Sequence, residues 1–181
     1  MLTNSLIEEQ MMSSLRSPED LSHRLGLRPT AEQAELMHRF YEDEDPLQIV
    51  EVPSQQTTNA VALCALWRLL RVEGSKCIVI AANRDLEGRF MKFMRDITTT
   101  IDPALTSVCK WTGSKSMKLG DQAGHELRMV SNRPEWLQGL GGEAITFVVL
   151  GARSSEPKFC ATMEVVDTYR KQEGARHIVM W

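Results

Sequence analysis

Two uninterrupted apolar runs constrain the fold of this chain more than any other feature of its sequence. Residues 77–82 and 144–150 are almost entirely apolar, and neither run alternates between apolar and polar side chains. A strand with one solvent-facing side alternates, whereas a strand covered on both faces does not, and such strands are typical of parallel sheets. The sequence therefore predicts an α/β fold with a mainly parallel sheet flanked by helices.

The rest of the chain also switches between strand and helix patterns. Strands are predicted at residues 47–52, 77–82, 108–111, 116–119, 126–130, 144–150 and 175–181, and helices at residues 18–25, 30–41, 58–72, 86–97 and 159–169. Strands joined by crossover helices favour parallel pairing, because each helix returns the chain to the same end of the sheet.

Capping signals near the N-terminus predict a short helical arm. Ser17 followed by Pro18 supplies an N-cap and a proline in the first helical turn, and Gly26 supplies the end of that helix. A new helix is expected to begin after Thr30. We therefore divide the chain into a helical arm, residues 1–26, and an α/β domain, residues 27–181.

Composition excludes several classes of protein. The 181 residues carry a net charge of −3, and 43% of them are hydrophobic, as in an ordinary globular domain. The acidic balance excludes a general basic coat for nucleic acid. No apolar stretch approaches the roughly 20 residues that span a bilayer, and acidic residues stand where a signal peptide carries positive charge. We expect a cytoplasmic protein with no membrane partner.

The cysteines do not form a metal-binding or disulfide pattern. Cys64, Cys77, Cys109 and Cys160 lie far apart in the sequence, and the four histidines are equally scattered. Zinc sites bring two ligands within a few residues of each other, and no such pair occurs here. The spacing predicts reduced, mostly buried thiols and no metal site.

The turn after the first predicted strand is where an α/β fold of this kind binds its ligand. A phosphate-binding loop has the pattern G-x-x-x-x-G-K-[ST], in which the glycine backbone wraps the phosphates, the lysine neutralises charge and the hydroxyl holds Mg²⁺. The turn in this chain, residues 52–59, retains Thr57 and Thr58 but has no glycine and no lysine. A polar loop that caps the next helix explains the same residues without a ligand.

A second catalytic element is also missing. A motor ATPase ends a buried strand in an Asp-Glu pair that serves the metal and the attacking water, whereas the strand at 144–150 is followed by Gly151 and Ala152. Glu156 lies further along and is expected in a loop. Because both elements are absent at two different strand ends, the sequence argues against ATP hydrolysis.

The order of these elements resembles the ATPase domain of the large terminase subunit of tailed bacteriophages, the DNA-packaging motor. Matching pieces are Leu27-Arg28-Pro29 with Gln33, the strand and helix start at 49–58, the strand at 77–82, Lys110-Trp111, and the segments 132–139 and 176–181. The resemblance covers residues 27–181 and implies a P-loop NTPase-like fold. It also implies a remnant nucleotide site formed by Gln33, Ser54, Gln55, Gln56, Thr57 and Thr58. The chain departs from the family at its two diagnostic motifs, because it lacks the loop lysine and the strand-end carboxylates.

The leading hypothesis is therefore a catalytically inactive terminase-like domain. It would need no cofactor and would act as a structural or regulatory partner of other packaging-machine subunits in the host cytoplasm, with self-association as a further option. One alternative is an active motor fragment that uses ATP and Mg²⁺, with the missing lysine supplied by Lys76 or by a neighbouring subunit. Another is a module that binds DNA or protein through a helix carrying Arg89, Lys92 and Arg95.

Overall fold

A computed structural model describes residues 13–42, 47–50, 55–120, 125–130, 135, 137, 144–151, 155–169 and 176–180; for residues 47–50, 55 and 176–180 it describes the backbone alone. Residues 1–12 of the predicted arm, residues 51–52 of the first predicted strand and most of segment 132–139 lie outside the described residues.

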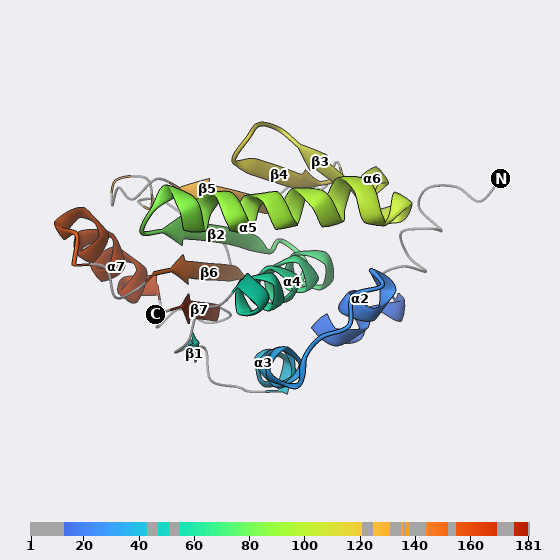
Figure 1. Ribbon diagram of the computed structural model, residues 1–181. Coiled ribbons are helices and arrows are strands. Elements are labelled where there is room, and N and C mark those ends of the chain that lie inside the picture. The colour runs from blue at the N-terminus through green and yellow to red at the C-terminus, as the bar shows by residue number, and fades with distance from the viewer. Residues whose placement is uncertain are drawn as a thin grey trace.

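The described strands form a seven-stranded sheet, drawn at the centre of Figure 1. Their order across the sheet is β1 (Leu47–Val50), β7 (Arg176–Met180), β6 (Ile145–Leu150), β2 (Lys76–Ala81), β5 (Glu126–Val130), β4 (Ser116–Leu119) and β3 (Cys109–Trp111). Strands β1, β7, β6, β2 and β5 pair in parallel, and β4 and β3 extend the sheet as an antiparallel hairpin. The prediction of a mainly parallel sheet is confirmed.

The described helices are α2 (Pro18–Arg24), α3 (Ala31–Glu42), α4 (Gln55–Arg71), α5 (Arg84–Asp96), α6 (Pro103–Val108) and α7 (Pro157–Tyr169), with a π-helix, η1 (Ile97–Ile101), between α5 and α6. The sequence predicted α2, α3, α5 and α7 to within a few residues. Helix α4 begins three residues earlier than expected, and Val108 closes α6 instead of starting a strand. Helix α6 was missed although Asp102-Pro103 repeats the cap-and-proline signal of Ser17-Pro18.

Helix α2 begins and ends as its sequence predicts. The Ser17 side chain accepts a hydrogen bond from the Asp20 N–H, and the Asp20 carboxylate accepts one from the Ser17 N–H, which completes a capping box. Gly26 follows the helix with a φ of 69°, a left-handed conformation that side chains other than glycine adopt at a cost.

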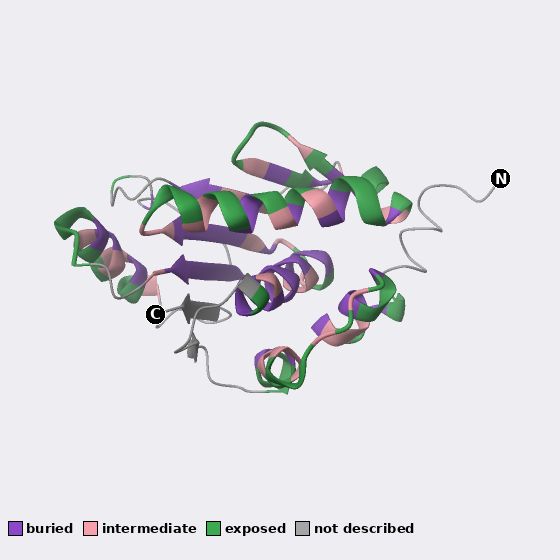
Figure 2. Ribbon diagram, in the orientation of Figure 1, coloured by how far each residue is buried: buried purple, intermediate pink, exposed green. Residues whose placement is uncertain are grey.

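Each central strand contributes to two hydrophobic clusters, one on each face of the sheet. On one face, Cys77 and Val79 of β2 pack with helices α4 and α5; on the other, Ile78 and Ile80 pack with Phe159 of α7. Figure 2 shows β2 and β6 as buried strands at the centre of the molecule. This double coverage is the physical reason that their sequences do not alternate.

The described part of the predicted arm packs on the same core as the rest of the chain. Leu15 and Leu21 are almost completely buried, and the Leu15 carbonyl accepts a hydrogen bond of 3.1 Å from the indole N–H of Trp67 on α4. Phe40 and Tyr41 of α3 pack edge-on against the same indole ring. The boundary between residues 26 and 27 stays a prediction.

A buried histidine joins the end of α4 to the start of two strands. His125 Nε2 accepts the N–H of Gly74 at 3.0 Å, and its Nδ1 lies 3.0 Å from the carbonyl of Leu69. Because a carbonyl can only accept, Nδ1 carries the proton and the ring is neutral. The pair of bonds ties α4 and β2 to β5.

Within the described residues, the helices are too short or too polar to cross a membrane.

The cysteines differ sharply in accessibility, and this predicts their reactivity. Burial raises the pKa of the Cys77 and Cys109 thiols to about 12 and also raises the pKa of Cys64, whereas Cys160 on α7 is exposed. Because the thiolate is the reactive form, we expect Cys160 alone to react with a thiol reagent in the native protein at neutral pH. Denaturant should expose the other three thiols to the reagent.

A Cys160→Ser variant is the control for this measurement, and it should show no fast native labelling. Rapid labelling of two or more thiols in the folded protein would contradict the burial described above.

Candidate functional site

The parallel strands direct their carboxyl ends to one edge of the sheet. The arrowheads of β2, β6 and β7 point to the same side in Figure 1. Helix α4 begins five residues after β1 ends. Residues 51–54 of the turn that the sequence singled out lie outside the described residues. Ligands in open α/β sheets bind outside this edge, and a ligand site at the start of α4 stays a prediction.

Two of the predicted site residues, which are 23 positions apart, come together. The side-chain Nε2 of Gln33 donates a hydrogen bond of 2.7 Å to the carbonyl of Gln56 in the first turn of α4. The Gln33 Oε1 accepts the Thr30 N–H at 2.7 Å, and the Thr30 hydroxyl accepts the Gln33 N–H in return. Gln33 therefore caps α3 and holds it against the start of α4.

The threonines of the predicted site are turned into the protein. Thr57 is 1% exposed and Thr58 is 3% exposed, whereas Gln56 is exposed. A phosphate or a hydrated metal ion could reach these hydroxyls only after neighbouring groups moved. Ser54 and the side chain of Gln55 lie outside the described residues.

Gly151, directly after β6, occupies the position where the sequence lacks a strand-end carboxylate. This glycine has a φ of 80°, and a Cβ added to it would lie 2.9 Å from Leu86 Cδ1 and 3.0 Å from Ala82 Cβ. Both distances are shorter than ordinary van der Waals contact. Any side chain at this position, that of aspartate included, is therefore strained by the backbone conformation and requires Leu86 and Ala82 to shift.

Of the two substitutes that the sequence offers, Lys76 and Glu156, Lys76 does not lie where it is needed. Lys76 opens β2 at the amino edge of the sheet, about 16 Å along the strand direction from the carboxyl edge. This geometry excludes Lys76 as a replacement for the phosphate-loop lysine. Glu156 is exposed, at the start of α7. A lysine from a neighbouring subunit stays a prediction.

Two further charged residues lie at the carboxyl edge. Arg84 and Asp85, both exposed, begin α5 directly beyond the end of β2, where Asn83 caps the helix through the N–H groups of Asp85 and Leu86. Their place at the edge follows from the strand-to-helix order alone. In the part of the chain that the structure describes, no three His, Cys, Asp or Glu side chains are grouped to hold a metal ion.

The three candidate DNA-binding residues have different environments. Lys92 forms an exposed ion pair of 2.6 Å with Asp96, one turn along α5. The Arg95 guanidinium lies 4.3 Å from the centre of the Trp111 ring and donates to the carbonyls of Gly113 and Ser114. Arg89 is exposed on the same helix. Arg95 therefore has a structural role in holding the β3–β4 hairpin, whatever else it binds.

Comparison with solved structures identifies the fold. The chain superimposes on the large terminase of bacteriophage HK97 with a TM-score of 0.63 and 14% identity, over 85% of this chain and 33% of the terminase. It superimposes on the large terminase ATPase domain of Thermus phage P74-26 with a TM-score of 0.52 and 15% identity, over 87% of this chain and 67% of that domain. A mutant of the same domain gives a TM-score of 0.56 and 13% identity, over 88% and 67%.

The comparisons therefore show a P-loop NTPase-like α/β fold, that of a terminase-like ATPase domain, which confirms the predicted fold class. The chain spans about a third of the HK97 large terminase. No model of a known protein family matches the sequence, and no curated protein matches it either.

The packing at Gly151 predicts an unequal response to alanine. Gly151→Ala should lower the free energy of unfolding by about 2–4 kcal/mol, because it adds contacts with Leu86 and Ala82 to the cost of a left-handed backbone. Gly26 is the matched control, since its φ is also positive and nothing lies within 4 Å of its added Cβ. Gly26→Ala should cost about 1–2 kcal/mol. Equal losses in chemical denaturation would show that the close approach at Gly151 is unimportant.

Proposed function

We propose that this protein is a terminase-like ATPase domain that does not hydrolyse ATP and that serves DNA packaging as a structural or regulatory component. The observation that carries the proposal is Gly151. The strand end that would present a metal-binding carboxylate carries a glycine whose positive φ and close neighbours disfavour any side chain.

The first turn of α4 supports the same proposal. Phosphoryl transfer depends on positioning and on positive charge around the phosphates. The loop before α4 supplies no lysine, and Lys76 lies at the opposite edge of the sheet. The Gln33 side chain donates a hydrogen bond to the backbone carbonyl of Gln56, and Thr57 and Thr58 are buried. The framework is kept while the groups that would act on a nucleotide are absent or engaged elsewhere.

Contact with other proteins is the role that such a framework can still perform. The HK97 and P74-26 proteins that share this fold are described as large terminases, and the proposed partners are accordingly other subunits of a packaging machine. The charge of α5 does not favour DNA as the main ligand, because Asp85, Glu87 and Asp96 offset most of the charge of its four basic residues.

ATP turnover provides the direct test. The purified protein should release no phosphate above background from saturating Mg²⁺·ATP, with or without double-stranded DNA, because both the cation and the carboxylate are missing from the site. A thermal-shift measurement with Mg²⁺·ATP and Mg²⁺·ADP reports nucleotide binding separately from hydrolysis.

The variants Thr57→Val and Glu156→Gln show whether any ATP turnover comes from the candidate site. Turnover in the unmodified protein that either substitution abolishes would overturn the proposal and would establish the active-motor alternative. Turnover that survives both substitutions would point to a contaminating ATPase, and the proposal would stand.

A further inference from the structure

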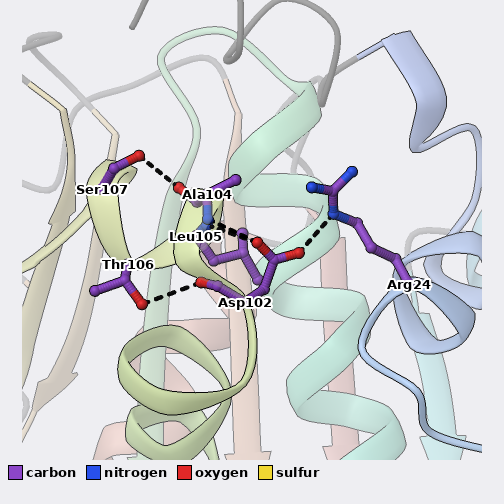
Figure 3. Close-up of polar contacts among 6 residues, drawn as sticks. All are labelled: Arg24, Asp102, Ala104, Leu105, Thr106 and Ser107. Atoms are coloured by element: carbon purple, nitrogen blue, oxygen red, sulfur yellow. Dashed lines mark hydrogen bonds and ion pairs between the residues drawn. The ribbon is translucent and has the colours of Figure 1, made fainter.

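A single carboxylate links three separate elements at the end of α5. Asp102 Oδ2 accepts a hydrogen bond of 2.7 Å from Nε of Arg24 on α2, and its Oδ1 accepts the N–H groups of Ala104 and Leu105 at 2.7 and 3.3 Å. Figure 3 shows these contacts converging on one side chain. The Asp102 side chain is 10% exposed and that of Arg24 is 33% exposed.

The charge on Asp102 depends on these partners. Burial by itself raises the pKa of this carboxyl, but the hydrogen bond and charge of Arg24, with the N–H groups of Ala104 and Leu105, hold the pKa below its ordinary value. A charge this deeply buried is costly once a partner leaves, so loss of Arg24 would draw the Asp102 side chain toward solvent and weaken the cap of α6.

Helix α6 connects Asp102 directly to the β3–β4 hairpin. The last residue of α6, Val108, precedes the first residue of β3, and its carbonyl accepts the N–H of Gly120 at the end of β4 at 2.7 Å. The position of α6 therefore sets the position of both hairpin strands at their base.

The π-helix η1 supplies a second connection. The Thr98 hydroxyl donates to the Met94 carbonyl at 2.7 Å and accepts the Trp111 indole N–H at 3.0 Å. The Thr99 hydroxyl donates to the Arg95 carbonyl at 2.7 Å. These bonds to carbonyls one turn upstream compete with regular α-helical pairing, and π-helical segments are rare enough to mark places where a helix can change register.

Residues of α5 hold the tip of the hairpin. Arg95 covers the Trp111 ring and donates to the carbonyls of Gly113 and Ser114. Lys115 forms an ion pair of 2.7 Å with Glu87. One set of polar contacts thus joins α2 to α6 through Asp102, and a second set joins η1 to the hairpin through Thr98 and Trp111. The chain itself connects the two sets, because Asp102 directly follows η1.

We propose that the Arg24–Asp102 ion pair couples the docking of α2 to the order of the β3–β4 hairpin, so that release of α2 loosens the hairpin through η1 and α6. Coupling between two places is reciprocal, so loosening the hairpin also weakens the docking of α2. The segment that contains α2 is then a regulatory element. Displacing α2 changes the surface of the β3–β4 hairpin, to which α2 contributes no residue.

Amide hydrogen exchange of the full chain tests this proposal. Arg24→Met keeps much of the side-chain volume and removes the charge and the donor. It should accelerate exchange in residues 109–119 on the order of tenfold, in addition to any change within α2. Arg16→Met is the matched control, because Arg16 is an exposed arginine in the same segment, and it should leave the hairpin unchanged. Exchange that rises only within α2 and α6 would overturn the proposal.

A double-mutant cycle separates coupling from general destabilisation. Thr98→Val keeps the shape of the side chain and removes its hydroxyl, so it should loosen the hairpin by itself and leave little further effect for Arg24→Met. Trp111→Phe should accelerate exchange in α2, as reciprocity requires. Additive effects of Arg24→Met and Thr98→Val, or no response of α2 to Trp111→Phe, would show that the two regions are independent. Arg24→Lys, which keeps the charge, provides a milder variant if Arg24→Met does not fold.

Discussion

Burial of the central strands on both faces is the constraint on which the rest of this structure depends. All six residues of β6 are buried, and β2 beside it is buried at its four central positions. Such strands need helices on both sides, and the crossovers that supply them make the pairing parallel. Parallel pairing in turn brings the carboxyl ends of β1, β7, β6 and β2 to one edge of the sheet.

That edge has the strand-to-helix order of a terminase-like ATPase fold, but the turn before α4 has no lysine and β6 is followed by glycine. Glycine at position 151 lets Leu86 of α5 and Ala82 approach the end of β6 closely. Gln33 has become part of the helix packing through Thr30 and Gln56.

Much of the fold could be predicted because its signals are local. Apolar runs gave the strands at 77–82 and 144–150, and side-chain caps placed α2 and α3. The π-helix could not be predicted, because its geometry depends on Thr98 reaching both Met94 and the indole of Trp111, which is 13 residues away. At the candidate site, the sequence showed that the loop lysine and the strand-end carboxylates are missing, but it could not show that Gln33 contacts Gln56. Nor could it show that Arg95, elsewhere on the molecule, contacts the β3–β4 hairpin.

The sequence by itself determined the class of fold and the absence of a phosphate-loop lysine, because hydrophobic periodicity and residue identity need no knowledge of distant neighbours. The tertiary structure decided everything that depends on which side of the sheet a residue occupies. It moved Lys76 to the edge opposite the site, gave the glycine after β6 a packing role, and made Asp102 a junction between α2, η1 and α6. These roles arise from contacts between segments that only the folded sheet brings together.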